Sequence, residues 1–219
     1  MSPSMDVTEG RATGDDRPLA PRMADRTNVL LLSPTGDQAG MQVHADLLAI
    51  EPPERENVLL VTLEGSPDDR LLEWRSHVSH TAPAQMGMVS VNDGVRSATS
   101  AAGGIRHPID TFSLATVPEA TDLTGIGLTV SEYLSEWHGD GNQIVVCFDS
   151  LDPIVADVNP ELAFRFIHTL TAQFRRVDAL AHFHLDPEAH DEATIKTLLP
   201  LFDAVIEVDE ESPARISRR

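Results

Sequence analysis

The sequence predicts an α/β domain built on a mostly parallel sheet with helices on both faces. Short apolar runs alternate with segments of helical spacing, which is the order expected when helical crossovers join parallel strands. The runs are unbroken and do not alternate with polar residues, as in strands that are buried on both faces. Strands are expected at residues 28–32, 58–63, 144–148, 179–183 and 202–208.

Helices are expected between these strands because the intervening segments carry start signals or apolar stripes. Ser66 is followed by Pro67 and Asp69, and Thr129 by Glu132, so each set resembles a capping box. The expected helices cover residues 41–50, 129–137 and 187–199, with two more that begin after Ser66 and Asn159. The apolar stripe of the helix after Asn159 consists of Leu162, Phe166, Ile167, Leu170 and Phe174.

The segment from 81 to 127 has a weaker pattern. Strands are expected at 86–91 and 109–116, and the small residues of 97–104 predict a loop between them.

The chain is expected to form one domain with two tails. Residues 1–26 are rich in Asp, Arg, Pro, Gly and Ser and lack apolar periodicity, so they are predicted to be a disordered acidic tail. The domain is expected over 27–210, and residues 211–219 are expected to be a charged C-terminal tail.

The charge of the chain excludes some classes of partner. Its 219 residues carry 35 acidic and 16 basic side chains, for a net charge of −19. Such a surface repels phosphates, so nucleic acids and anionic membranes are not expected as partners. The composition is typical of halophilic archaea, because it combines an acidic excess, a low aromatic content and arginine in place of lysine. Lys196 is the single lysine.

The sequence offers no sign of export or of a structural metal. No apolar run approaches the roughly 18 residues of a membrane span, and the N-terminus lacks the apolar stretch of a secretion signal. A cytoplasmic location is therefore expected. The single cysteine, Cys147, excludes an internal disulfide and falls far short of a zinc cluster, so no metal is expected.

The turn after the first strand stands where a phosphate-binding loop would lie, because ligands of such sheets bind at the carboxyl ends of the strands. A working loop follows G-x-x-x-x-G-K-[ST], in which backbone N–H groups and the lysine hold phosphates and the hydroxyl holds magnesium. Laid on this pattern, Ser33 replaces the first glycine, Gln38 the second, Ala39 the lysine and Gly40 the hydroxyl residue.

Three further residues of the same turn are relevant. Thr35 and Gly36 keep the turn small and polar, whereas Asp37 adds a carboxylate where anions would bind. The turn is therefore either a vestigial nucleotide loop or a plain tight turn without a ligand.

Two other strand ends carry acids. Asp149 follows the run 144–148, as in sequences that hold magnesium or its water shell, or else it caps the amides of Ser150 and Leu151. Glu64 leaves the second strand just before the Ser66 cap, where it can also complement the start of the helix.

Taken together, these ends resemble the RecA superfamily, and within it the KaiC-like branch. The resemblance covers residues 27–210 and is carried by four segments: L-L-L-S-P-T-G-D-Q-A-G-M, L-V-T-L-E-G-S-P-D-D, I-V-V-C-F-D-S-L and F-D-A-V-I-E-V-D. It implies a RecA-like P-loop NTPase fold. It places Glu64 on the first of a catalytic glutamate pair, with Gly65 on the second, and Asp149 on the magnesium-associated acid.

The departures from that family predict a protein that does not hydrolyse ATP. Ala39 removes the lysine, Gly40 removes the hydroxyl and Gly65 halves the glutamate pair. Each lost group would stabilise phosphate charge in the transition state. Glu64 and Asp149 are then vestigial, no catalytic residue and no cofactor are expected, and the predicted role is regulation or scaffolding, as in signal transduction. The expected partners are proteins, either ATPase paralogues or further copies of the chain.

Two alternatives stay open. One is a weak ATP-binding or ATP-hydrolysing enzyme, with ATP and magnesium as cofactors, in which Arg165, Arg175 and Arg176 replace the missing lysine. The other is an accessory of DNA repair, which the net charge opposes.

The segment H-F-H-L-D-P-E-A-H contains three histidines. His182 and His184 share one face of a strand, and such a pair can bind a metal. With His190 they match no established zinc spacing, so half-buried or surface histidines are the favoured interpretation.

Overall fold

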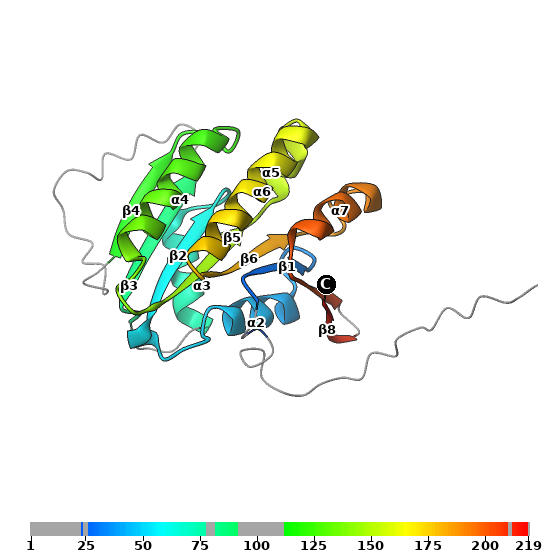
Figure 1. The fold of residues 1–219 in the computed structure, drawn as a ribbon. Coiled ribbons are helices and arrows are strands. Elements are labelled where there is room, and N and C mark those ends of the chain that lie inside the picture. The colour runs from blue at the N-terminus through cyan, green and yellow to red at the C-terminus, as the bar shows by residue number, and fades with distance from the viewer. Residues whose placement is uncertain (1–22, 24–25, 78–81, 92–111, 210–211, 219) are drawn as a thin grey trace, which may run out of the picture.

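The computed structural model describes residues 23, 26–77, 82–91, 112–209 and 212–218. Within these residues the chain forms one sheet of eight strands, in the order β4-β3-β2-β5-β6-β1-β7-β8 (Figure 1). The strands are β1 (Asn28–Leu32), β2 (Glu56–Thr62), β3 (Gln85–Val91), β4 (Phe112–Val117), β5 (Gln143–Asp149), β6 (Leu180–Leu185), β7 (Ala204–Asp209) and β8 (Ser212–Arg218).

Strands β1 to β7 pair in parallel, and β8 pairs antiparallel with β7. Every residue of β1 and β2 is buried. Unbroken burial requires cover on both faces of the sheet. The predicted α/β fold with a mostly parallel sheet is therefore confirmed.

Helices lie on both faces of the sheet (Figure 1). One face packs against α4 (Leu123–Trp137), α5 (Asp152–Asp157), α6 (Pro160–Arg176) and α7 (Glu192–Leu198). The other, called the α2/α3 face, packs against α2 (Gln38–Leu47) and α3 (Pro67–His77). Two short 3-10 turns complete the described elements, η1 (Pro53–Arg55) and η3 (Leu199–Leu201).

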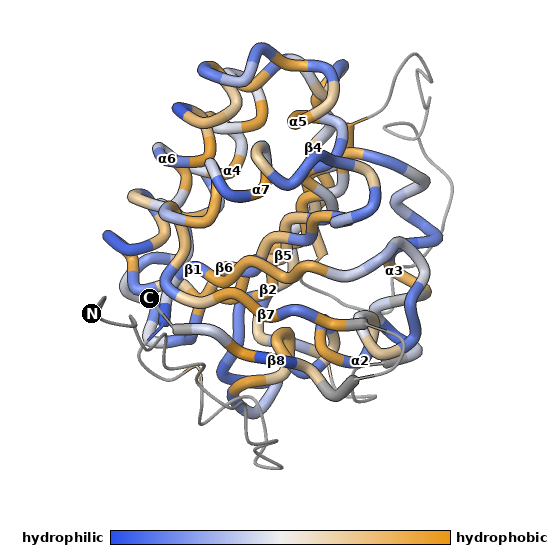
Figure 2. The backbone as a smooth tube through the Cα atoms, turned by 90° about the vertical axis from the view of Figure 1, so that its right-hand side faces the viewer, coloured by the Kyte–Doolittle hydropathy of each residue, from blue (hydrophilic) through white to orange (hydrophobic). Residues whose placement is uncertain are grey.

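The core under α4 and α6 is continuous and rich in aromatic rings. Phe183 lies at its centre, with ring centroids 5.5 Å from Phe148, 5.9 Å from Phe174 and 5.3 Å from Phe202. The central strands are the most hydrophobic part of the chain (Figure 2). Burial of these rings is a principal source of stability, because each removes a large apolar area from water.

The α2/α3 face is divided, in contrast. One apolar cluster gathers Trp74, Met86 and Met88, and another gathers Val29 and Ile206. Across the sheet, the strand register places Leu60, Cys147, His182 and Val29 side by side. A fully buried histidine therefore separates two apolar clusters that would otherwise be continuous.

Several predicted elements are confirmed in detail. Ser66 Oγ accepts a hydrogen bond from the Asp69 amide at 3.1 Å and donates one to the Asp69 carboxylate, so it caps α3 as expected. Asn159 caps α6 through the Glu161 amide. Each expected strand overlaps an observed one, although residues 109–111 of the expected strand 109–116 and the expected loop 97–104 lie outside the described residues.

Three helix boundaries differ from the prediction. Helix α4 begins at Leu123 and is capped by Asp122, so the predicted start at Thr129 is wrong. Thr129 lies inside the helix, where its hydroxyl donates to the Gly125 carbonyl. The earlier start is favoured because it buries Ile126 completely. Helix α2 runs over 38–47 and not 41–50, and α7 begins at Glu192, well after the expected 187.

The prediction for one member of the α6 stripe is also wrong. Leu162 is 51% exposed, and Ala163 takes its place in the core.

The C-terminal residues do not form the expected tail. Residues 212–218 form β8, in which Ile216 pairs with Ile206 while Arg215 faces solvent. Ala214 and Ile216 alternate toward an apolar cluster of the α2/α3 face, and this burial stabilises the strand. Within the expected N-terminal tail, Met23 is buried in the same cluster, and residues 1–22 lie outside the described residues.

Asp203 links three elements at the amino-terminal edge of the sheet. Its carboxylate accepts hydrogen bonds from the backbone of Thr27 and Asn28 and from the Thr27 hydroxyl, and it forms an ion pair with Arg175 of α6 at 3.0 Å. Burial raises the pKa of Asp203, but the hydrogen bonds from Asn28, Arg175 and Thr27 outweigh burial, so the pKa lies below its ordinary value.

We predict that Asp203→Ala lowers the free energy of unfolding by about 1.5–3 kcal/mol, as is typical for hydrogen bonds to a charged group. Because the folded protein lowers this pKa, the contribution is complete above the ordinary pKa of aspartate. It is lost as pH falls below about 4 and the carboxylate is protonated. Denaturant unfolding across pH measures both effects, with exposed Asp157→Ala as the control. Equal stability of the two variants at pH 7 would contradict the prediction.

Candidate functional site

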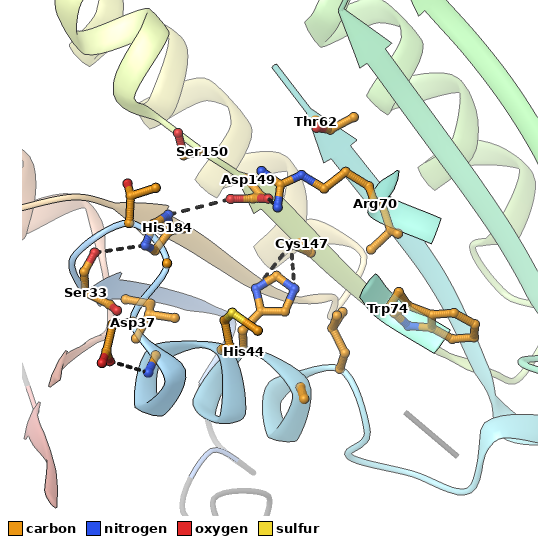
Figure 3. Close-up of a pocket in the computed structure, with 18 of the residues that line it drawn as sticks. Ser33, Asp37, His44, Thr62, Arg70, Trp74, Cys147, Asp149, Ser150 and His184 are labelled. Atoms are coloured by element: carbon orange, nitrogen blue, oxygen red, sulfur yellow. Dashed lines mark hydrogen bonds and ion pairs between the residues drawn. The ribbon is translucent and has the colours of Figure 1, made fainter. Parts of the chain in front are cut away.

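A cavity of about 240 Å³ opens at the carboxyl ends of β1, β2 and β5, between α2 and α3 (Figure 3). Most of the site residues expected from the sequence line it together: Ser33, Thr35, Gly36, Asp37, Gly40, Glu64 and Asp149. Gln38 and Ala39 are exposed and are not part of the lining. The three strand ends therefore converge on one cavity, and Ala39, which stands where a working phosphate loop has its lysine, is outside the lining.

Two amides of the turn between β1 and α2 donate to carboxylates of the chain itself. Asp37 caps α2 by accepting a hydrogen bond from the Gly40 amide at 2.7 Å. Asp186, which follows β6, accepts one from the Thr35 amide at 2.9 Å. Backbone amides at a helix start are the groups that bind anions, and here two internal anions already bind them.

Asp186 is ionised in this position. Burial raises its pKa, but hydrogen bonds from the amides of Thr35 and Glu188, together with nearby His184, outweigh burial and lower the pKa below its ordinary value. The Asp186 amide donates in turn to Asp152, which also contacts His190 Nε2 at 2.7 Å. His190 thus supports the loop after β6 and does not line the cavity.

Asp149 is engaged by two basic side chains. Arg70 of α3 contacts Asp149 Oδ2 at 2.8 Å, and His184 Nδ1 lies 3.6 Å from Oδ1 (Figure 3). His184 Nε2 lies 3.0 Å from the Ser33 carbonyl, to which it donates. Asp149 makes no described contact with the amides of Ser150 or Leu151. The alternative in which Asp149 caps these two amides is therefore not supported.

Four polar side chains form a square on adjacent strands of the α2/α3 face. Cys147 pairs with His182 in the β5/β6 register, and Asp149 and His184 occupy the next row toward the carboxyl edge. The shared face of His182 and His184 was expected. His182, however, is fully buried, so the expectation of half-buried or surface histidines is wrong for this residue.

His44 of α2 lies next to Cys147 (Figure 3) and also contacts His182. Its Nδ1 lies 3.3 Å from His182 Nε2, and Cys147 Sγ lies 3.8 Å from Nδ1 and 3.6 Å from Nε2. The two imidazole rings meet edge to face, with centroids 4.8 Å apart. Burial lowers the pKa of His182 well below its ordinary value, and the nearby His44 and His184 lower it further, so this ring is neutral at neutral pH.

The sequence did not reveal His44 or Arg70 as site residues. Each lies on a helix, and its direction depends on how the helix docks on the sheet. The proposed substitutes for the lysine lie elsewhere, because Arg165, Arg175 and Arg176 belong to α6 on the opposite face. Lys196 forms an exposed pair with Glu192 at 2.6 Å.

A model for the family described as "Family of unknown function (DUF7504)" matches residues 26–208. The chain belongs to the DUF7504 family. None of the curated proteins compared with this DUF7504 chain matches it.

Solved structures from Pyrococcus horikoshii OT3 resemble the DUF7504 chain at low identity. PH0250 has a TM-score of 0.54 at 7% identity, covering 91% of each chain. PH0321, crystallised in complex with an unknown peptide, has a TM-score of 0.51 at 10% identity, covering 87% of this chain and 81% of its own. The KaiC-like protein PH0186 has a TM-score of 0.49 at 13% identity, covering 88% and 79%. The first two show a shared fold.

Among the helices described for this DUF7504 chain, none combines the length and apolar character needed to cross a bilayer.

The packing of α2 against the β1 turn gives a prediction for this DUF7504 chain. A Cβ atom on Gly40 would collide with the Ser33 side chain, whereas one on Gly127 of α4 would meet Phe166 at an ordinary 3.6 Å. We expect Gly40→Ala to destabilise the fold by about 1–3 kcal/mol through overpacking. The matched Gly127→Ala should be neutral or stabilising by about 0.5–1 kcal/mol, since alanine is the better helix former.

Chemical denaturation of both variants tests this packing, and Ser33→Gly should restore most of the stability of Gly40→Ala. An equal effect of the two alanines would show that α2 does not pack against Ser33 as described.

Proposed function

We propose that this chain is a RecA/KaiC-like regulatory or scaffolding protein that acts through contacts with other proteins without hydrolysing ATP. One observation carries the proposal: two amides of the β1 turn, those of Thr35 and Gly40, are bound by Asp186 and Asp37. In the superfamily that the sequence resembles, the corresponding loop binds phosphate. An incoming phosphate would have to displace two carboxylates and would meet no lysine there.

The charges around the cavity support the same proposal. Asp37, Asp186 and Glu64 present negative charge toward the place of the nucleotide phosphates. Asp149, which would associate with magnesium, is held by Arg70 at 2.8 Å and is 15% exposed. Metal binding by Asp149 would have to compete with that ion pair, which already satisfies part of its charge.

Exposed apolar side chains support a role in protein contacts. Leu128 of α4 is 62% exposed and Leu162 of α6 is 51% exposed, on helices that pack side by side. Apolar side chains in solvent on two neighbouring helices are available for contact with a partner. PH0321, which shares the fold, is described in complex with a peptide. The proposed partners are ATPase paralogues or further copies of the chain, in a regulatory or signalling role.

The test is nucleotide binding by the full chain in molar KCl, a solvent chosen because the composition is typical of halophilic archaea. A ligand at 100 times its dissociation constant stabilises a protein by about 2.7 kcal/mol, which raises the melting temperature by several degrees. We expect no such shift with millimolar Mg-ATP and no release of phosphate. Micromolar binding that Asp149→Ala abolishes, and the control Asp157→Ala retains, would contradict the proposal.

A second candidate function is weak ATP binding or hydrolysis, with ATP and magnesium as cofactors. The observation that favours it is Arg70, a cation in the cavity lining that can bind phosphate. Under this alternative Arg70→Met removes nucleotide binding, whereas under the proposed function neither the native chain nor the variant binds.

A further inference from the structure

Three potential metal ligands from three separate elements meet beneath the cavity. They are His44 of α2, Cys147 of β5 and His182 of β6, and one ligand atom from each lies within 4.8 Å of the other two. Parallel pairing of β5 with β6 places Cys147 beside His182 on the α2/α3 face. His44 approaches Cys147 from α2 (Figure 3), and its ring also contacts His182.

The two distances from His44 match the edges of a tetrahedral site, and the third, between Cys147 and His182, is at most 4.8 Å. With metal–nitrogen bonds of about 2.05 Å and a metal–sulfur bond of about 2.3 Å, a tetrahedron has nitrogen–nitrogen edges of about 3.3 Å and nitrogen–sulfur edges of about 3.6 Å. His44 Nδ1 lies 3.3 Å from His182 Nε2 and 3.8 Å from Cys147 Sγ. A small rotation of the half-buried His44 ring would point a nitrogen at the common centre.

The surroundings provide a second, independent observation. His182 is fully buried, and its Nδ1 makes no hydrogen bond to any described residue. Buried polar atoms without a partner are rare and call for an explanation. With the proton on Nδ1, the Nε2 atom of the buried ring, which faces His44 at 3.3 Å, carries the lone pair that a metal ion would take. Cys147 is 2% exposed, so its thiol is shielded from bulk solvent.

We infer that His44, Cys147 and His182 form a binding site for a transition metal ion of the zinc class. A thiolate with two imidazoles selects zinc and related soft or borderline ions over magnesium and calcium, which prefer oxygen ligands. His44 and Cys147 also line the cavity, so the fourth coordination position faces it. Three protein ligands and an open fourth position are the arrangement of zinc sites that bind an exchangeable ligand.

The inference is independent of the proposed function, because it makes no use of nucleotide. It departs from the expectation of no metal, which rested on cysteine counting and could not detect ligands from three distant segments.

The experiment titrates the metal-free full chain with Zn²⁺ by calorimetry in molar KCl, and with Co²⁺ by absorption spectroscopy. We expect one ion per chain and a thiolate-to-cobalt charge-transfer band. His44→Ala should weaken Zn²⁺ binding by at least about 100-fold, since loss of even an outer-shell partner costs about 10- to 100-fold. The control is His168→Ala, an exposed histidine on α6 that should leave binding unchanged.

Cys147→Ala should abolish the charge-transfer band. The Cys147→Ala variant alters a buried residue, and its folding must be checked. The His44→Ala variant gives a result that does not depend on this check, because alanine is a strong helix former and His44 lies on the half-buried helix α2. The inference is overturned if no stoichiometric ion binds, if His44→Ala binds as tightly as the native chain, or if bound Co²⁺ shows no thiolate band.

Discussion

The parallel pairing of β5 with β6 is the constraint on which the site depends. Because side chains alternate along a strand, the register that opposes Cys147 to His182 also brings Asp149 and His184 together one row further. A slip of β6 by one residue would turn His182 and His184 toward the aromatic core and turn Phe183 out of it. The burial of that core therefore maintains the register, and the register assembles the polar square on the other face.

Much of the fold follows from local patterns that the tertiary structure reinforces. The apolar run 28–32 became β1 with the same bounds, because a strand buried on both faces needs no alternation. The caps at Ser66 and Asn159 were predictable because their hydrogen bonds are made within three residues. The convergence of Ser33, Glu64 and Asp149 on one cavity was predictable as well, since each follows a strand of a parallel sheet.

The remaining features depend on contacts between distant segments. Asp122 prevailed over Thr129 as the cap of α4 because the longer helix buries Ile126. Strand β8 follows a charged segment. The alternation of Ala214 and Ile216 predicts a strand only when β7 is known to lie beside it, because the two side chains are buried by that pairing. The direction of His44 depends on the docking of α2 and cannot be derived from the residues adjacent to it.

The ion pair between Arg70 and Asp149 has a consequence for how this acidic protein meets other molecules. At molar salt the Debye length falls to about 3 Å, which is comparable with the 2.8 Å of this pair. Charges on the open surface then no longer act on an approaching molecule. The partly buried pair of Arg70 and Asp149 keeps its attraction, because little salt solution comes between the two groups. In molar salt, encounter would therefore proceed by unassisted diffusion, and charge would distinguish one molecule from another only inside the cavity.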